Sequence, residues 1–215
     1  MSSVASSTGA GSSTRPAYAK RLERVASALI GLSLIAVSIP DSFGPDRVAV
    51  QRIAAILGVL VGVLLIVRKP AKHNGSNAQI AAALPSLIVG SLLLRLLIGS
   101  QPTWWMLAIS TTGAILSVTA FGTLGKSFAV LPSRRDVVTR GPYKFLRHPA
   151  YLGQWLVMTG CAGAAAPPWL GLALAVGLLP WLALRAVAEE RLLSEDPVYV
   201  RYMETVQWRI IPGIW

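Results

Sequence analysis

Two short stretches of this chain combine residue types that can do chemistry. The first is Arg147-His148-Pro149-Ala150-Tyr151, which places a guanidinium, an imidazole and a phenol close together. Because proline suits the first turn of a helix, we expect a helix to begin at Pro149, with His148 at its N-cap. The free backbone N–H groups of that turn, together with the Arg147 guanidinium, would form a positive site suited to an anion.

The second stretch is Arg185-Ala186-Val187-Ala188-Glu189-Glu190, at the end of an apolar run. Arg185 and Glu189 are spaced i, i+4, so they share one face of a helix. A carboxylate held where hydrocarbon meets water is costly unless it meets a cation. We therefore expect the two stretches to meet in one pocket, with donors for an anion and a carboxylate for a cation. Taken singly, the same residues also fit interfacial aromatic belts and an ordinary salt bridge.

The composition is typical of a membrane protein. Of 215 residues, 53% are hydrophobic and 13% are charged, whereas a soluble domain has about 25% charged residues. The net charge is +11, but the basic residues lie between apolar runs, as in cytoplasmic loops, and form no RNA-binding motif or recognition helix. This pattern argues against nucleic-acid binding. One cysteine and two histidines offer no metal-ligand spacing, so we expect no metal site.

The hydropathy pattern predicts an all-α, polytopic membrane bundle of about six transmembrane helices, with a cofactor pocket at the cytoplasmic ends of the last helices. Residues 1–20 are expected to be a disordered tail, 21–125 four transmembrane helices and 126–215 a catalytic core. The predicted spans are Val25–Ile39, Val48–Val67, Gln79–Ile98, one that ends near Leu124, Ala150–Ala166 and Trp169–Val187. The basic loops place both termini in the cytoplasm, and the short loops favour a bacterial cytoplasmic membrane.

The combined pattern resembles the isoprenylcysteine carboxyl methyltransferase family, which belongs with the membrane phospholipid methyltransferases. The resemblance rests on Arg147–Gly153 and Glu189–Leu193, preceded by Val137–Tyr143 and followed by Asp196–Tyr202. It covers roughly residues 120–212 and none of the first three spans. It implies that S-adenosylmethionine donates a methyl group to a lipophilic acceptor that enters from the bilayer. The acceptor could be the carboxylate of an isoprenylated cysteine, a free isoprenoid or fatty acid, or a phospholipid amine.

The resemblance also implies roles for individual residues. The expected cofactor contacts are Asp136, Val137, Val138, Tyr143, His148, Pro149, Ala150, Tyr151 and Glu189. The candidate catalytic residues are Arg185, Arg147 and Glu190. Arg185 takes the position that faces the acceptor, where it can hold a carboxylate bidentately. Transfer of an activated methyl group is an in-line displacement, which needs alignment more than a strong base.

Two other classes of protein remain open. The tail Trp208–Trp215 resembles those of NADPH-dependent membrane sterol or lipid reductases, but their motif expects Asn and Asp where this chain has Ala150 and Gln154. A small transporter or assembly factor would need polar residues at mid-membrane, and spans one, two and four offer few. The methyltransferase interpretation is therefore favoured. We expect membrane lipids to surround the protein, and the sequence does not specify an oligomeric state.

Overall fold

The computed structural model describes residues 17–43, 49–67, 73–74, 103–125, 133–134, 137–163 and 168–215. The helices in this part are α1 (Ala17–Phe43), α2 (Ala49–Val67), α4 (Trp104–Leu124), the 3-10 helix η2 (Gly141–Lys144), α5 (Pro149–Gly163), α6 (Pro168–Leu193) and α7 (Pro197–Thr205). Strands β1 (His73–Asn74) and β2 (Ser133–Arg134) have two residues each and pair antiparallel, with His73 opposite Arg134. Apart from this short ladder the described chain is helical, as predicted.

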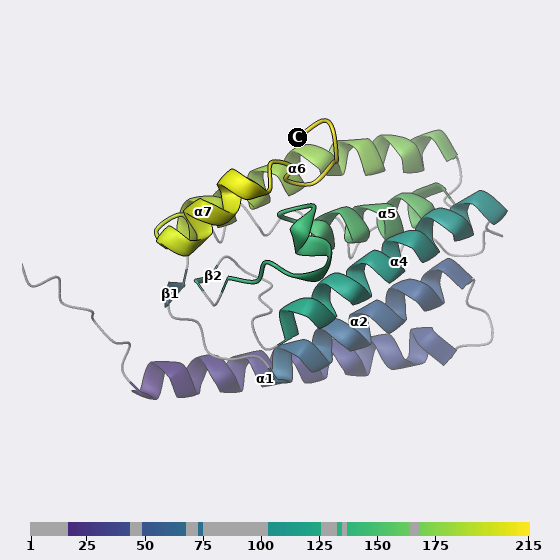
Figure 1. Ribbon diagram of the computed structural model, residues 1–215. Helices are drawn as coiled ribbons and strands as arrows, with labels where there is room; N and C mark the ends of the chain where they lie inside the picture. Colours follow the sequence, from purple (N-terminus) through teal and green to yellow (C-terminus); the bar gives the residue numbers. More distant parts are fainter. Residues whose placement is uncertain are drawn as a thin grey trace, which may run out of the picture.

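The long helices pack in chain order, so that α1 contacts α2, α2 contacts α4, α4 contacts α5 and α5 contacts α6 (Figure 1). Helices α5 and α6 run in opposite directions. The beginning of α5 and the end of α6 therefore lie at the same end of the bundle, where α7 and the C-terminal segment also lie (Figure 1). This arrangement brings together the two stretches that carry the candidate chemistry.

Small residues let α4 and α5 approach closely. Gly113 and Ser117 of α4 are buried, as is Gly153 of α5. A Cβ atom added at Gly113 would lie 2.6 Å from the carbonyl oxygen of Gly153 and 2.7 Å from the backbone nitrogen of Val157. Contacts of this kind are common between membrane helices, where small side chains allow the backbones to pack against each other. The same contact holds α5, and with it the start of the candidate site, against α4.

Among the described residues, α4 is the one helix that is both long and apolar enough to cross a membrane. It has 21 residues, and its mean hydropathy is 1.5. Two further apolar helical segments, Arg24–Ala36 and Arg52–Val67, are shorter. The predicted third span, Gln79–Ile98, lies outside the described residues. The count of six spans thus stays a prediction.

Three helix boundaries differ from the expected ones, and one of them is the end of α1, which lies at Phe43 and not at Ile39. The other two are polar extensions. Helix α1 begins at Ala17, inside the segment 1–20 that was predicted to be a disordered tail, of which residues 1–16 are not described. Helix α6 continues past the predicted end at Val187 to Leu193. In both places the added residues are mostly Ala, Lys, Arg, Glu and Leu, which have high helix propensity although they do not extend the apolar run. The hydropathy pattern therefore locates the apolar part of each helix but does not detect the helical turns that consist of polar residues.

Replacing Gly113 with alanine should destabilise the protein, because the added methyl group meets backbone atoms of α5. We expect a loss of roughly 1–3 kcal/mol, as for other overpacked sites, measured by thermal unfolding in detergent. Gly122 lies on the same helix, and a Cβ atom there would meet nothing within 4 Å. The Gly122→Ala variant is the matched control and should be unchanged or more stable. Equal melting temperatures for the two variants would contradict the close packing of α4 and α5.

Candidate functional site

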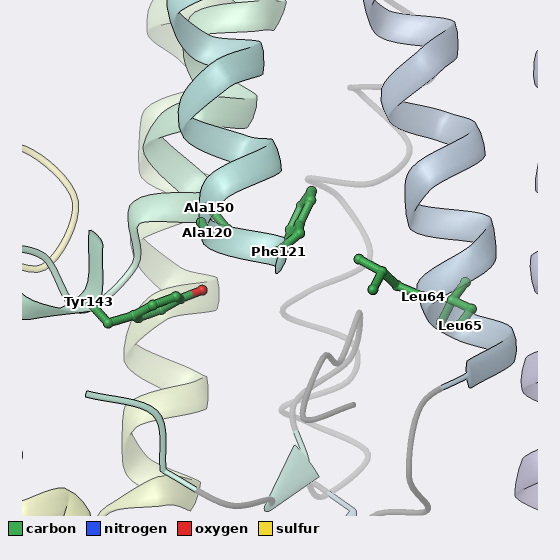
Figure 2. Packing of buried hydrophobic residues seen from close by; sticks show 6 residues of the cluster. All are labelled: Leu64, Leu65, Ala120, Phe121, Tyr143 and Ala150. Atoms are coloured by element: carbon green, nitrogen blue, oxygen red, sulfur yellow. The ribbon is translucent and has the colours of Figure 1, made fainter. Parts of the chain in front are cut away.

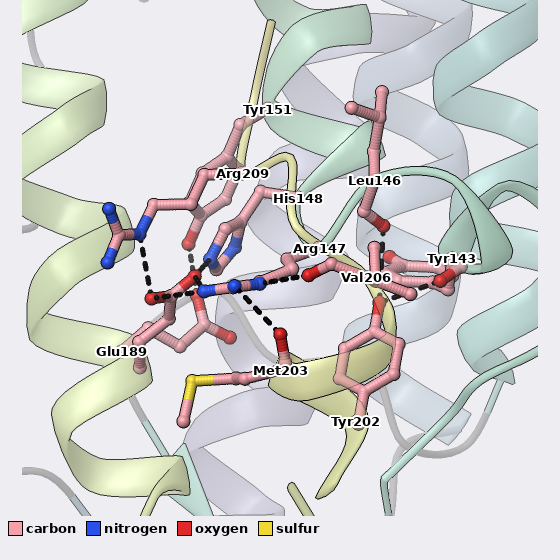
Figure 3. A network of polar contacts seen from close by, with 11 residues as sticks. Tyr143, Leu146, Arg147, His148, Tyr151, Glu189, Tyr202, Met203, Val206 and Arg209 are labelled. Carbon is pink, nitrogen blue, oxygen red and sulfur yellow. Dashed lines mark hydrogen bonds and ion pairs between the residues drawn. The ribbon is translucent and has the colours of Figure 1, made fainter. Parts of the chain in front are cut away.

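The candidate site forms where the start of α5 meets the end of α6. The carbonyl oxygen of His148 accepts hydrogen bonds from the backbone N–H groups of Tyr151 and Leu152, at 3.0 and 3.3 Å, so His148 begins the first turn of α5. Figure 3 shows the side chains of His148 and Tyr151 pointing toward the end of α6, which carries Glu189. The juxtaposition expected from the two sequence stretches is therefore present in the structure.

A single carboxylate, that of Glu190, binds three basic side chains. Its oxygens lie 3.1 Å from Nε2 of His148, 3.2 Å from Nη1 of Arg147 and 2.9 Å from Nε of Arg209. We call these four residues the ionic cluster. Burial alone would raise the pKa of a carboxyl group, but the hydrogen bonds from His148 and Arg209 and the charges of His148 and Arg147 lower the pKa of Glu190 to about 2. Glu190 is therefore ionised at neutral pH.

Arg147 also fastens the C-terminal segment to the start of α5 (Figure 3). Its Nε donates to the carbonyl oxygen of Val206 at 2.6 Å, and its Nη2 donates to that of Met203 at 3.0 Å. The backbone N–H of His148 donates to the carbonyl oxygen of Arg209 at 2.8 Å. Since every one of these contacts joins residues far apart in the chain, the ionic cluster fixes α5, α6 and the C-terminal segment relative to one another.

Tyr151 contacts both His148 and the face of α6 that carries Arg185 and Glu189. Its ring stacks on that of His148, with centroids 5.1 Å apart and planes inclined by 12°. The guanidinium carbon of Arg185 lies 4.7 Å from the centre of the same ring, within the range of a cation–π interaction. The hydroxyl of Tyr151 donates a hydrogen bond to Oε2 of Glu189. Tyr151 thus sets the positions of Arg185 and Glu189 relative to the first turn of α5.

Glu189 and Glu190 are adjacent but have different surroundings. Glu189 is half-buried, and Tyr151 is its one hydrogen-bond partner in the part of the chain that the structure describes. It forms no ion pair with any described residue, whereas Glu190 contacts three basic groups. Because an ionised carboxylate can accept about four hydrogen bonds, Glu189 retains capacity for a cation or for further donors.

Tyr143 closes the site on the side of α2 and α4. It is buried in a cluster with Leu64, Leu65, Phe121 and Ala150 (Figure 2). Burial raises the pKa of Tyr143, and the charges of Glu189 and Tyr202 raise it further, so the hydroxyl stays protonated. The predicted cofactor contact Tyr143 is thus placed near the Glu189 carboxylate, on an apolar wall.

The remaining predicted residues lie around this centre. Pro149 and Ala150 are buried in the first turn of α5, Val138 packs against the Tyr143 cluster, and Val137 packs against a cluster on α7. Asp136 lies outside the described residues. The roles assigned to all the predicted residues from the family resemblance stay predictions. The contacts of Arg147 and Glu190 give those two a positioning role.

Sequence reasoning did not find Arg209. Its guanidinium carbon lies 4.8 Å from the ring centre of Trp215, and the carbonyl oxygen of Trp215 accepts the backbone N–H groups of Arg209, Ile210 and Ile211 at 2.9–3.2 Å. This turn directs Arg209 at Glu190. The signal available in the sequence was a lone arginine between aromatic residues of the tail, which was connected only with the reductase alternative.

Comparison with known proteins identifies the part of the chain that carries this site. Residues 101–196 match the model of the phospholipid methyltransferase family, in agreement with the predicted resemblance. The match includes α4, η2, α5 and all of α6, with both sequence stretches of the site. It ends before α7, so the tail that carries Arg209 lies beyond it.

Two plant proteins are similar to the chain. Protein-S-isoprenylcysteine O-methyltransferase B of Arabidopsis thaliana is 32% identical over 119 residues, which cover 50% of this chain and 60% of that protein. Protein-S-isoprenylcysteine O-methyltransferase A of the same plant is 29% identical over 119 residues, with the same coverage. The chain thus spans 60% of the length of these curated relatives.

Replacing Glu190 with glutamine should change how stability depends on pH. The folded pKa of about 2 lies below the ordinary value of 4.5, so the ionised carboxylate stabilises the fold above pH 4.5 and this contribution is lost as the pH falls through 2. We expect the wild-type protein to melt above Glu190→Gln at neutral pH, and the difference to shrink between pH 4.5 and 2. The measurement is thermal unfolding in detergent across this range.

Glu204 is exposed on α7, and Glu204→Gln is the matched control. It should follow the wild-type protein at every pH. A difference between wild type and Glu190→Gln that stays constant on acidification would contradict the proposed ion pairing of Glu190.

Proposed function

We propose that this chain is an integral membrane methyltransferase that uses S-adenosylmethionine to methylate a lipophilic acceptor. The observation that carries the proposal is the contrast between the two adjacent acids. Glu190 is satisfied by three basic groups, whereas Glu189 is half-buried and paired with no described cation. A carboxylate in such a place favours a cationic ligand. The family match of residues 101–196 supports the same class of enzyme.

The residues of the site fit the chemistry of this methyl donor, which carries a sulfonium, an ammonium and a carboxylate. Glu189 offers a negative charge for the cationic groups. The N-terminal end of α5 offers positive partial charges for an anionic group. Tyr143 adds a buried aromatic side chain, and aromatic faces attract cations. The site therefore presents opposite charges within one compact region, as a zwitterionic ligand requires.

When bound, S-adenosylmethionine supplies a methyl group that is already activated by the positive sulfur. The protein must then align the acceptor and exclude water. Arg185 is 4% exposed and is held on the ring of Tyr151, so its guanidinium is fixed beside Glu189. We assign it the binding of an acceptor carboxylate, because a guanidinium can donate two parallel hydrogen bonds to that group. Glu190, Arg147 and Arg209 hold the helices that carry Arg185, Glu189 and Tyr151.

A cavity of about 140 Å³ supports an acceptor with a hydrocarbon chain. It lies between α1, α2, α4 and α5, and its walls are apolar except for Gln154; Leu57, Phe121 and Met158 are among the residues that line it. An engineered apolar cavity of about 150 Å³ holds benzene, so this one has room for a group of about six carbons. That volume suits one branched unit of an isoprenoid chain. Together with the names of the two plant relatives, this volume favours the carboxylate of an isoprenylated cysteine as the acceptor.

Replacing Glu189 with glutamine should weaken binding of S-adenosylmethionine. Loss of a charge-assisted contact corresponds to roughly a ten- to hundredfold higher Kd, measured by calorimetry on the purified protein in detergent. The exposed Glu204→Gln variant should bind as the wild type does. The same titration with NADPH tests the reductase alternative, and binding of NADPH in place of S-adenosylmethionine would overturn the proposed function.

Replacing Arg185 with alanine should abolish methyl transfer and leave the affinity for S-adenosylmethionine unchanged. The physical reason is that Arg185 is assigned to the acceptor and Glu189 to the donor. Transfer is measured by mass spectrometry of membrane lipids and of isoprenylated cysteine peptides after incubation with an isotopically labelled methyl donor. Arg201→Ala, which removes an exposed arginine of α7, is the control. Undiminished turnover in Arg185→Ala would remove this residue from the mechanism.

A further inference from the structure

The two buried tyrosines of α7 differ in their hydrogen bonding. Tyr199 and Tyr202 are 4% and 6% exposed, and their ring centroids lie 5.5 Å apart. The hydroxyl of Tyr202 donates to the carbonyl oxygen of Tyr143 at 2.7 Å and lies 3.2 Å from that of Leu146. The hydroxyl of Tyr199 is buried and has no hydrogen-bond partner in the described part of the chain. One tyrosine therefore has a clear structural role, and the other carries a polar atom that the described structure leaves unused.

An unused buried hydroxyl requires an explanation, because burying a polar group without a partner costs free energy. A phenylalanine at position 199 would fill nearly the same space without that cost. More than nine in ten buried polar groups in proteins are hydrogen-bonded, and each exception calls for an explanation, such as a catalytic role or a bound water or ion. The Tyr199 hydroxyl is thus available for a partner that the described part of the chain does not supply.

The surroundings of Tyr199 indicate what that ligand is. Its ring belongs to an apolar cluster with Tyr202 and Val206, packed against Val137, Leu193 and Met203. Leu193 is the last residue of α6, the helix that carries Glu189. Burial raises the pKa of Tyr199, and the charges of Glu190, Glu189 and Tyr202 raise it further against the opposing charge of Arg147. The hydroxyl is therefore a neutral donor and acceptor within an apolar cluster, near both acids.

We propose that the hydroxyl of Tyr199 binds the nucleoside part of the methyl donor and is satisfied only when that ligand is present. The proposal rests on the proposed function and adds α7 to the donor site, beyond the segment that matches the family. An apolar cluster that carries one neutral hydroxyl suits a nucleoside, which combines a flat base with ribose hydroxyls and ring nitrogens. The charged end of the donor would lie toward Glu189.

The test compares Tyr199→Phe with Tyr202→Phe in the full chain, purified in detergent. Without ligand, Tyr199→Phe should melt at the same temperature as the wild type or higher, because it removes an unsatisfied polar atom. Tyr202→Phe should melt lower, because it leaves the carbonyl oxygens of Tyr143 and Leu146 without their donor. With S-adenosylmethionine present, Tyr199→Phe should show a smaller rise in melting temperature and a Kd about three- to tenfold higher by calorimetry.

Fragments of the donor locate the contact. The Kd of adenosine should rise from the wild type to Tyr199→Phe by the same factor as the Kd of S-adenosylmethionine. The Kd of methionine should be the same for both proteins. Wild-type affinity of Tyr199→Phe for both S-adenosylmethionine and adenosine would overturn the assignment of Tyr199 and leave the proposed function standing. A wild-type protein that binds neither S-adenosylmethionine nor adenosine would overturn the proposed function and this inference with it.

Discussion

The site depends on one buried carboxylate that is shared by three basic groups. Removing a carboxylate from water costs several kcal/mol unless cations replace the lost hydration, and the basic groups around Glu190 would repel one another without it. Arg147 and His148 come from the start of α5, Arg209 comes from the C-terminal segment, and Glu190 comes from the end of α6. The buried carboxylate is paired only when these three parts of the chain fold onto one another. The constraint acts at the helix ends and adds to the packing of small residues that holds α5 against α4.

A helix turns by about 100° per residue, so two consecutive acids point in different directions. At the end of α6 this difference in direction gives Glu189 and Glu190 different roles. Glu190 turns toward Arg147 and the C-terminal segment and completes the fold, while Glu189 turns toward Tyr151 and keeps capacity for a ligand. Had both acids been saturated, the site would hold no charge for a cation. Had both been open, the helix ends would lack the ion pairs that fix their separation.

Local sequence signals predicted much of this arrangement. Pro149 marked the start of α5, and the i, i+4 spacing of Arg185 and Glu189 marked their shared face. Both signals come from helix geometry and need no knowledge of the rest of the fold. The C-terminal contacts were not predictable in this way. The carbonyl oxygens of Met203 and Val206 accept hydrogen bonds from Arg147. Every residue has a backbone carbonyl group, so the sequence does not indicate which ones will accept these bonds. Arg209 lies in a segment without periodicity, and its partner is fixed only by tertiary folding.

The N-terminal helices lie outside the family match, yet they form part of the same structure. Leu64 and Leu65 of α2 share a buried cluster with Tyr143 and Ala150 (Figure 2), and α1 and α2 form one side of the apolar cavity. The other side of the cavity is formed by α4 and α5, within the matched segment. Under the proposed function, the matched segment and α7 hold the methyl donor, while α1 and α2 shape the space for the hydrocarbon of the acceptor. Selection among acceptors would then depend partly on α1 and α2, which lie outside the segment that matches the family and carry none of the groups assigned to methyl transfer.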